Sequence, residues 1–121
     1  MSQFVEGSNK GYVANAAIGR GIAVKISSGQ VVVATAATDK IIGVTVDKAA
    51  ALETATVRLR SAAGTAVGKA GGTIAVGDKV TANGSGQLIT TVTAGNEIVG
   101  MAVEAALSGD LFEFMPMNDR V

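Results

Sequence analysis

The sequence predicts an all-β protein: a compact β-sandwich or barrel built from two pseudo-repeated β units, with an extended N-terminal arm. Three observations support this fold class. The apolar residues are mostly Ala, Val and Ile, accompanied by many Thr. β-Branched side chains favour strands because they fit a pleated surface better than a helix. Turn-forming Gly is frequent, with 16 in 121 residues. The third observation is an internal repeat.

The repeat has an offset of 57 residues, from Ser28 to Ser85. The stretch SGQVVVATAATDKIIGVTVDKA aligns without a gap with SGQLITTVTAGNEIVGMAVEAA. The identical positions include Gly29/Gly86, Gln30/Gln87, Ile41/Ile98, Gly43/Gly100 and Val46/Val103. A repeat of this length that occurs only twice does not make a solenoid. We therefore expect two units that bury their apolar faces against each other.

Each unit is expected to hold a strand, a turn, two more strands, a loop and a final strand. The expected strands are 11–18, 20–26, 30–35, 41–47, 55–60, 79–82, 87–93, 98–104 and 110–115. Residues 27–29 and 83–86 separate strand pairs at hairpin spacing, since Gly and Asn tolerate the positive φ of tight turns. Gly43 and Gly100 fall inside strands at matching positions, which indicates a β-bulge or a close approach of neighbouring backbone.

The chain divides into an arm over residues 1–10 and a single β domain over 11–121. Within that domain the repeats cover about 20–60 and 76–115, and residues 61–72 are expected to be a connector of small residues that is exposed and either flexible or locally strand-like. Residues 47–53 contain good helix formers, but the corresponding stretch of the second repeat ends in a turn signal, so we expect a loop in both. Pro116 is expected to end the last strand.

The sequence lacks the residues of the common catalytic and metal sites. It contains no His and no Cys, which excludes serine–histidine catalysis, thiol nucleophiles and the softer metal ligands. The ten acidic residues are scattered, mostly beside turns. The stretch 64–69 resembles a phosphate-binding P-loop but has three residues, not four, between its glycines, and Ala70 follows its Lys. We expect no enzymatic activity, no small-molecule substrate, no metal and no cofactor.

Charge and hydropathy exclude two further classes of partner. Ten basic and ten acidic residues give a net charge of zero, whereas a nucleic-acid-binding protein shows an excess of Lys and Arg. No run of 18 apolar residues could span a membrane, and the N-terminus lacks the apolar region of a signal peptide. A near-neutral surface does little to oppose association with other protein.

Several phrases of the second repeat resemble the capsid decoration (cement) proteins of tailed bacteriophages. They are Gly77-Asp-Lys-Val80, Gly86-Gln87, Ile98-Val-Gly-Met-Ala102 and Ala105-Ala-Leu-Ser-Gly-Asp110. The resemblance implies a small β-rich protein that is made in the host cytoplasm and added to the outer surface of the phage head. It also implies binding to the major capsid protein, commonly as a homotrimer, and mechanical stabilisation of the shell.

Two groups of residues are the candidates for contacts. The apolar pair Phe4 and Val5 in the arm, together with Tyr12, are candidate capsid contacts; the alternative for the arm is a disordered terminus. The C-terminal strand provides candidate subunit contacts, because Met and aromatic residues are enriched at interface cores. These are Leu111, Phe112, Phe114, Met115 and Met117. The alternative is that the face holding Phe112 and Phe114 closes the core of the chain itself.

Three other classes of protein remain as alternatives. Another small virion subunit, such as a tail or fibre accessory, would share this composition. A biotinyl- or lipoyl-type carrier would need a modifiable Lys on a hairpin between the halves. Lys69 lies in the connector but lacks the flanking methionine of that turn. A carbohydrate-binding module would need exposed aromatic side chains, and this sequence has one Tyr and no Trp.

Overall fold

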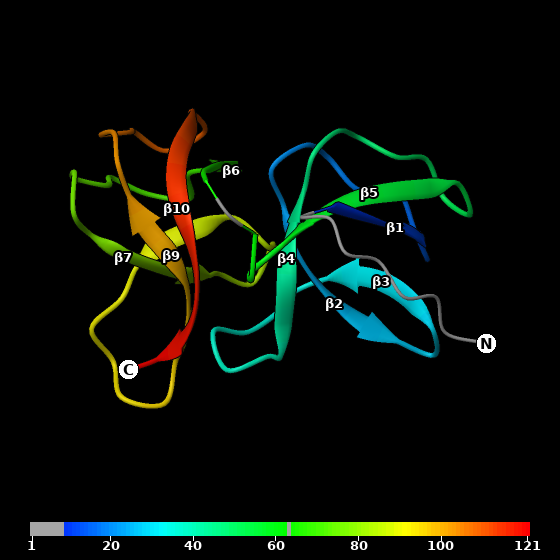
Figure 1. Cartoon of the computed structure of the whole chain (residues 1–121), viewed down its shortest axis with the longest axis horizontal. Coiled ribbons are helices and arrows are strands. Elements are labelled where there is room, and N and C mark those ends of the chain that lie inside the picture. Colours follow the sequence, from blue (N-terminus) through cyan, green and yellow to red (C-terminus); the bar gives the residue numbers. More distant parts are fainter. Residues whose placement is uncertain (1–8, 63) are drawn as a thin grey trace.

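The computed structural model describes residues 9–62 and 64–121, which form ten strands and no helix. The strands make two five-stranded antiparallel sheets that pack together, as Figure 1 shows, so the all-β prediction is confirmed. The first sheet contains β1 (Asn9–Val13), β2 (Ala23–Ser27), β3 (Gln30–Val33), β4 (Ile41–Thr45) and β5 (Thr54–Leu59). The second contains β6 (Ala66–Lys69), β7 (Lys79–Ala82), β8 (Leu88–Thr90), β9 (Glu97–Ala102) and β10 (Leu111–Arg120).

The two sheets have the same topology, which confirms the pseudo-repeat. The first has the order β1-β5-β4-β2-β3 and the second the order β6-β10-β9-β7-β8. A parallel bridge joins Ala14 to Val31 in the first unit, and Ala70 is joined to Leu88 in the second. Each bridge brings the two outer strands of a sheet together. Each sheet therefore curls toward a small barrel, and part of its exposed edge is closed.

The structure confirms one part of the prediction for the connector and corrects another. Strand β6 lies within residues 61–72, so the connector is locally strand-like, but Ala66 and Ala70 are buried rather than exposed. Strand β6 is the counterpart of β1, because the same 57-residue offset carries Asn9 onto Ala66. The sequence signal for this strand is weak, because Ala and Gly have low β-propensity. Burial against β10 outweighs that low propensity.

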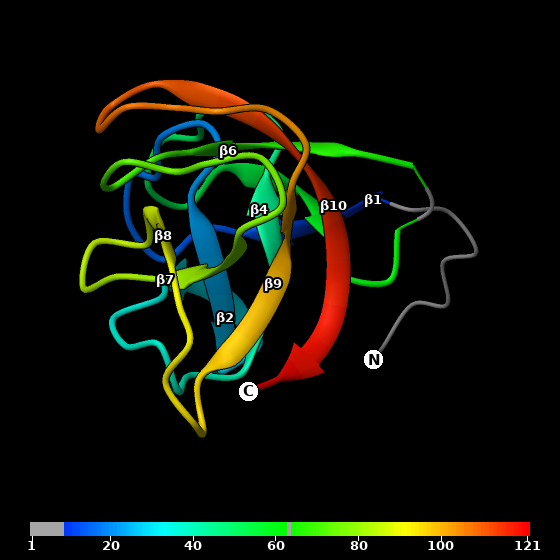
Figure 2. The same ribbon diagram turned by 90° about the vertical axis from the view of Figure 1, so that its left-hand side faces the viewer.

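The predicted end of the last strand at Pro116 is wrong. Strand β10 continues to Arg120, with a register shift between Pro116 and Asp119 where it pairs with β9. Strand β6 pairs with β10 only as far as Phe114. Beyond that residue β10 has β9 on one side alone, and Pro is tolerated where a strand lies at the edge of a sheet. Figure 2 shows β10 running beside β9 along one side of the molecule.

Two apolar clusters form the core. One lies within the first unit and includes Val24, Val31 and Val57. The other is shared by both units: it joins Ile41 and Val44 of the first sheet to Leu88, Phe112 and Phe114 of the second. The shared cluster explains why neither unit buries its faces alone. Burial of apolar surface between them contributes about 25 cal/mol per Å².

Leu52 lies in a strained turn of the loop between β4 and β5. Its φ is +66°, and its side chain is 71% exposed. The 57-residue offset places Gly109 at the corresponding position of the second unit, with φ +91°. A left-handed conformation costs an ordinary residue roughly 1–2 kcal/mol, whereas Gly adopts it freely.

We expect Leu52→Gly to raise the free energy of unfolding by about 1 kcal/mol, because it removes this strain and loses little buried surface. Gly109→Leu should lower it by a similar amount. Urea denaturation of both variants measures the two effects. A loss of stability in Leu52→Gly would contradict the prediction.

Candidate functional site

The described residues contain no cluster of acidic side chains that could hold a metal ion. No group of three or more Asp or Glu side chains converges in residues 9–62 and 64–121. A hollow of about 520 Å³ is an open depression beside the bridge between Ile18 and Ala49. It is lined mainly by Ala, Ile and Gly, with Lys48 and Glu53 at the rim.

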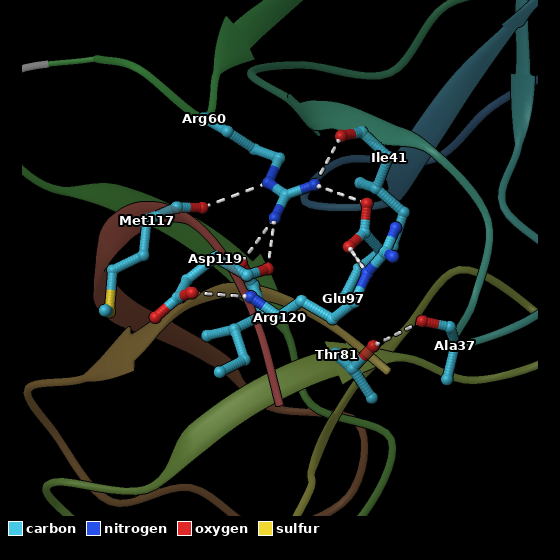
Figure 3. A network of polar contacts seen from close by, with 9 residues as sticks. Ala37, Ile41, Arg60, Thr81, Glu97, Met117, Asp119 and Arg120 are labelled. Carbon is cyan, nitrogen blue, oxygen red and sulfur yellow. Dashed lines mark hydrogen bonds and ion pairs between the residues drawn. The ribbon is translucent and has the colours of Figure 1, made fainter. Parts of the chain in front are cut away.

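Arg60 follows β5, is 7% exposed, and donates five hydrogen bonds from its guanidinium (Figure 3). Its Nε donates to the carbonyl oxygen of Met117 at 3.0 Å. Its Nη1 donates to Ile41 O at 3.0 Å and to Glu97 Oε1 at 3.4 Å. Its Nη2 donates to Ile98 O at 2.7 Å and to Asp119 O at 3.0 Å. These five hydrogen bonds use the full donor capacity of the guanidinium and join the first unit to β9 and β10.

Glu97, on β9, is the charged partner of Arg60 and is also buried. Its second carboxylate oxygen accepts a hydrogen bond from Arg120 Nε at 3.0 Å. Burial raises the pKa of Glu97, but the hydrogen bond from Arg120 and the charges of Arg60 and Arg120 outweigh it. The net pKa lies below the ordinary value of 4.5. The carboxylate is therefore ionised at neutral pH and helps to join the two sheets.

The lowered pKa gives a pH dependence with a defined sign. Because the folded-state pKa of Glu97 is below its unfolded value, ionised Glu97 contributes stability above about pH 4.5 and loses it as the pH falls through the folded pKa. We expect Glu97→Gln to be less stable than the parent at about pH 7 and the two stabilities to converge in acid. Urea denaturation of both proteins at neutral and at acid pH measures the difference between their free energies of unfolding. A difference that does not change with pH would contradict the prediction.

A second contact between the units is made by the loop between β3 and β4. Ala37 O accepts the backbone N–H of Glu97 at 2.8 Å and Thr81 Oγ1 at 3.3 Å. Asp39 shapes this loop: its Oδ2 accepts from Lys25 Nζ and from the backbone N–H of Thr35, each at 2.9 Å. The hydrogen bond from Lys25, followed by that from Thr35, lowers the pKa of Asp39. This carboxylate has a structural role.

The outward face of the second sheet carries an apolar surface along β10. Leu111 and Met115 are 44% and 41% exposed. Met115 lies directly opposite the half-buried Met101 of β9, and Glu113 lies opposite Val67 of β6. Side chains directly opposite each other share one face of a sheet. We call this group the β10 face: Val67, Met101, Leu111, Glu113 and Met115.

The structure divides the five candidate subunit residues between two environments. Phe112 and Phe114 point inward, are each 1% exposed, and have ring centroids 5.9 Å apart. They close the core of the chain itself, as the alternative stated, and their side chains are not accessible to a second copy. Leu111 and Met115 are on the outward face. Met117 is half-buried, and its carbonyl oxygen is bound by Arg60.

The three candidate capsid contacts are placed differently. Phe4 and Val5 lie outside the described residues. Tyr12 lies on β1 opposite the buried Ala55 and packs against the core of the first unit. Lys10 Nζ lies 5.1 Å from the centroid of its ring. Tyr12 is half-buried, so part of its surface remains accessible.

Sequence reasoning did not identify Arg60 and Glu97 as partners. They are 37 residues apart and belong to different repeats, and their repeat equivalents are Met117 and Lys40. A signal was nevertheless present in the departure from the repeat at these positions. Arg60 is a charge that its equivalent Met117 lacks, and Glu97 has the opposite sign to its equivalent Lys40. Such departures from the repeat, beside apolar strands, indicate a role between the copies.

The fold and these surfaces define an all-β protein of two related units, whose exposed apolar residues favour association with other protein. A sequence profile described as phage cement protein matches residues 20–115, and the chain belongs to this family. It is therefore a structural protein of the virion and is located on the capsid exterior.

Comparison with solved structures supports the same fold. The N base of head fiber gp8.5 of bacteriophage phi29 matches with a TM-score of 0.72 and 20% sequence identity. The match covers 93% of this chain and 96% of that one. At this identity the likeness establishes the fold alone. A comparison with curated proteins gives no match.

Proposed function

We propose that this cement protein binds the major capsid protein on the outer surface of the phage head, without enzymatic activity, and that it does so as a homotrimer. The observation that supports this most directly is the family match over residues 20–115. The absence of His and Cys from the sequence is consistent with a purely structural role. A trimer presents three identical capsid-binding surfaces. Once one surface is bound, the other two are held at a high effective concentration near the capsid, so three weak contacts combine. Bridging several capsid subunits in this way raises the energy needed to separate them.

The β10 face is the proposed contact between subunits. Leu111 and Met115 expose apolar surface beside Met101, and Met is enriched at interface cores. In a three-fold ring this face contacts a different surface of the next copy, because a contact between two identical faces would make a dimer. Phe112 and Phe114 then act indirectly, because they fix β10 to the core.

We expect Met115→Glu to convert the trimer to monomers, because a buried unpaired carboxylate is costly at an interface. The dissociation constant should rise at least about tenfold. Size-exclusion chromatography with light scattering measures the mass. Val92→Glu is the matched control, because Val92 is 88% exposed in the loop between β8 and β9. A wild-type chain that is monomeric at all concentrations would refute the trimer.

Capsid binding is tested by cosedimentation of the purified protein with expanded, DNA-free phage heads and, separately, with tails. We expect saturable binding to heads and none to tails. Deletion of residues 2–8, which spares β1, should weaken binding to heads if Phe4 and Val5 contact the shell. Unchanged binding of the deleted chain would eliminate the arm as a contact. Absence of binding to heads would overturn the proposed function.

A further inference from the structure

The charges of this net-neutral chain are divided unequally between its two halves. Residues 1–60 contain seven basic and four acidic side chains, whereas residues 61–121 contain three basic and six acidic ones. The half that holds the first unit therefore has a formal charge of +3, and the half that holds the second unit has a charge of −3. Complementary charges favour contacts in which the first unit of one copy meets the second unit of another.

Each unit exposes two charged side chains that form no ion pair. Within the described part of the chain, the ion pairs involve neither Arg20 nor Lys48 of the first unit, and both are exposed. They also involve neither Glu104 nor Glu113 of the second unit, which are exposed as well. Glu104 Oε1 accepts the backbone N–H of Glu113 at 2.8 Å, and Glu113 Oε2 accepts a hydrogen bond from Thr65 Oγ1. The two carboxylates are therefore positioned to meet basic side chains of another molecule.

Three of these four charges are present in one unit alone. Their counterparts under the repeat are neutral, and the pairs are Arg20/Val76, Lys48/Ala105 and Thr56/Glu113. The counterpart of Glu104 is Asp47, whose Oδ1 accepts the backbone N–H of Lys48 at 2.8 Å. Both units share one topology, so the fold does not require these differences. They give the two units different surfaces.

The two basic side chains border an apolar hollow. Ile18 and Ala49 exchange two backbone hydrogen bonds of 2.9 Å each, which places Arg20 and Lys48 on adjoining segments. The hollow of about 520 Å³ lies beside this bridge and is large enough for one or two apolar side chains. We call the following exposed residues of the two segments the basic surface: Ala17, Arg20, Val46, Lys48 and Ala50.

The β10 face complements the basic surface in polarity and in charge. It presents the exposed apolar side chains of Leu111 and Met115 on either side of Glu113. The charges of opposite sign on the two surfaces also match. Lys69 lies opposite Leu111 on the second sheet, and Glu53 lines the hollow of the first unit. Entry of Leu111 into the hollow of another copy would bring Lys69 toward Glu53.

The two surfaces adjoin on each chain. Val46 of the basic surface and Val67 of the β10 face line the same groove, where the first sheet meets β6. In a closed ring of three copies the contacting surfaces lie around one axis. Surfaces that adjoin on each copy are therefore compatible with such a ring.

We propose that the β10 face of each copy packs on the basic surface of the next copy, which closes a ring of three. Leu111 enters the hollow, and the carboxylates of Glu104 and Glu113 face the two basic side chains of that copy. The assignment rests on the trimer of the proposed function and adds to it the surface that the β10 face contacts.

Two double variants, one for each side of the contact, test the assignment. The acidic variant is Arg20→Glu with Lys48→Glu, and the basic variant is Glu104→Lys with Glu113→Lys. We expect each to be monomeric by size-exclusion chromatography with light scattering, with a dissociation constant at least about tenfold higher, because like charges then meet. All four substitutions in one chain should restore the trimer, because the charges are again complementary.

Lys40→Glu with Lys79→Glu is the matched control for the acidic variant. It changes the net charge by the same amount, and both side chains are exposed outside the two surfaces. We expect this variant to remain a trimer. Circular dichroism and urea denaturation verify that every variant is folded.

A 1:1 mixture of the acidic and basic variants distinguishes a ring from a two-fold contact. A copy with two acidic surfaces binds only a copy with two basic ones, and a ring of three cannot alternate two kinds of copy. We therefore expect pairs and no trimers in the mixture. Trimers in the mixture would refute the assignment.

The assignment and the proposed trimer fail separately. A trimer that persists in the acidic variant refutes the contact and leaves the proposed trimer intact. A wild-type chain that is monomeric at all concentrations refutes the trimer itself. A wild-type dimer would show that the β10 face makes a two-fold contact, which refutes the ring.

Discussion

Replacing Arg60 with Met is expected to lower the free energy of unfolding by about 3–5 kcal/mol. We expect no other substitution of a charged residue in the described chain to have a larger effect. The guanidinium makes five hydrogen bonds while 7% exposed. Its removal leaves the buried Glu97 carboxylate with Arg120 as its remaining charged partner and leaves four carbonyl groups without the donor they had. Buried polar groups that lose a partner cost far more than the original hydrogen bonds contribute.

Two further variants separate this mechanism from a general loss of packing. Arg60→Lys keeps the charge but cannot reproduce the planar fork, so we expect it to lose more than half of the same free energy. Arg120 is the second ionic partner of Glu97, and its own side chain is 59% exposed. We therefore expect Arg120→Met to lower the free energy of unfolding by less than about 1 kcal/mol. Urea denaturation of the three variants gives the comparison. Wild-type stability in Arg60→Met would refute the assigned role.

Substituting Ala for Gly43 or Gly100 is expected to lower the free energy of unfolding by about 3 kcal/mol in each case, at the upper end for overpacking. A Cβ at Gly43 would overlap the carbonyl oxygen of Arg58 on β5. One at Gly100 would overlap the carbonyl oxygen of Met115 and the ring of Phe114. Backbone in a paired strand cannot rotate away, so the strands must separate.

Gly72→Ala is the matched control, because no atom lies within 4 Å of the position its Cβ would occupy. We expect that variant to change the free energy of unfolding by less than about 0.5 kcal/mol. Thermal and urea denaturation measure all three. Equal stability of Gly43→Ala, Gly100→Ala and Gly72→Ala would show that the sheets accommodate the extra carbon.

These two glycines also show what sequence reasoning achieved. Their recurrence inside matching strands predicted a bulge or a close backbone approach, and both features are present. The register of β2 against β4 shifts beside Gly43, and both positions contact neighbouring backbone. The same repeat could have revealed β6 as the counterpart of β1. The low β-propensity of Ala66 and Gly68 obscured that strand.

The candidate site was predicted less completely than the fold. The alternation of Leu111, Glu113 and Met115 with Phe112 and Phe114 was visible in the sequence, because a strand alternates its faces with period two. Which face would be buried was not visible. The structure resolves this because the shared core of the two units lies on the phenylalanine side.

The sequence by itself determined the all-β class, the two-unit plan and the absence of His and Cys, because strand preference, turns and the inventory of side chains are local properties. The tertiary structure alone decided how the two units are joined. Arg60 reaches across to residues between 19 and 59 positions away along the chain. Such contacts depend on where the chain returns in space, and a sequence pattern with a period of two or a repeat of 57 residues contains no information about that path.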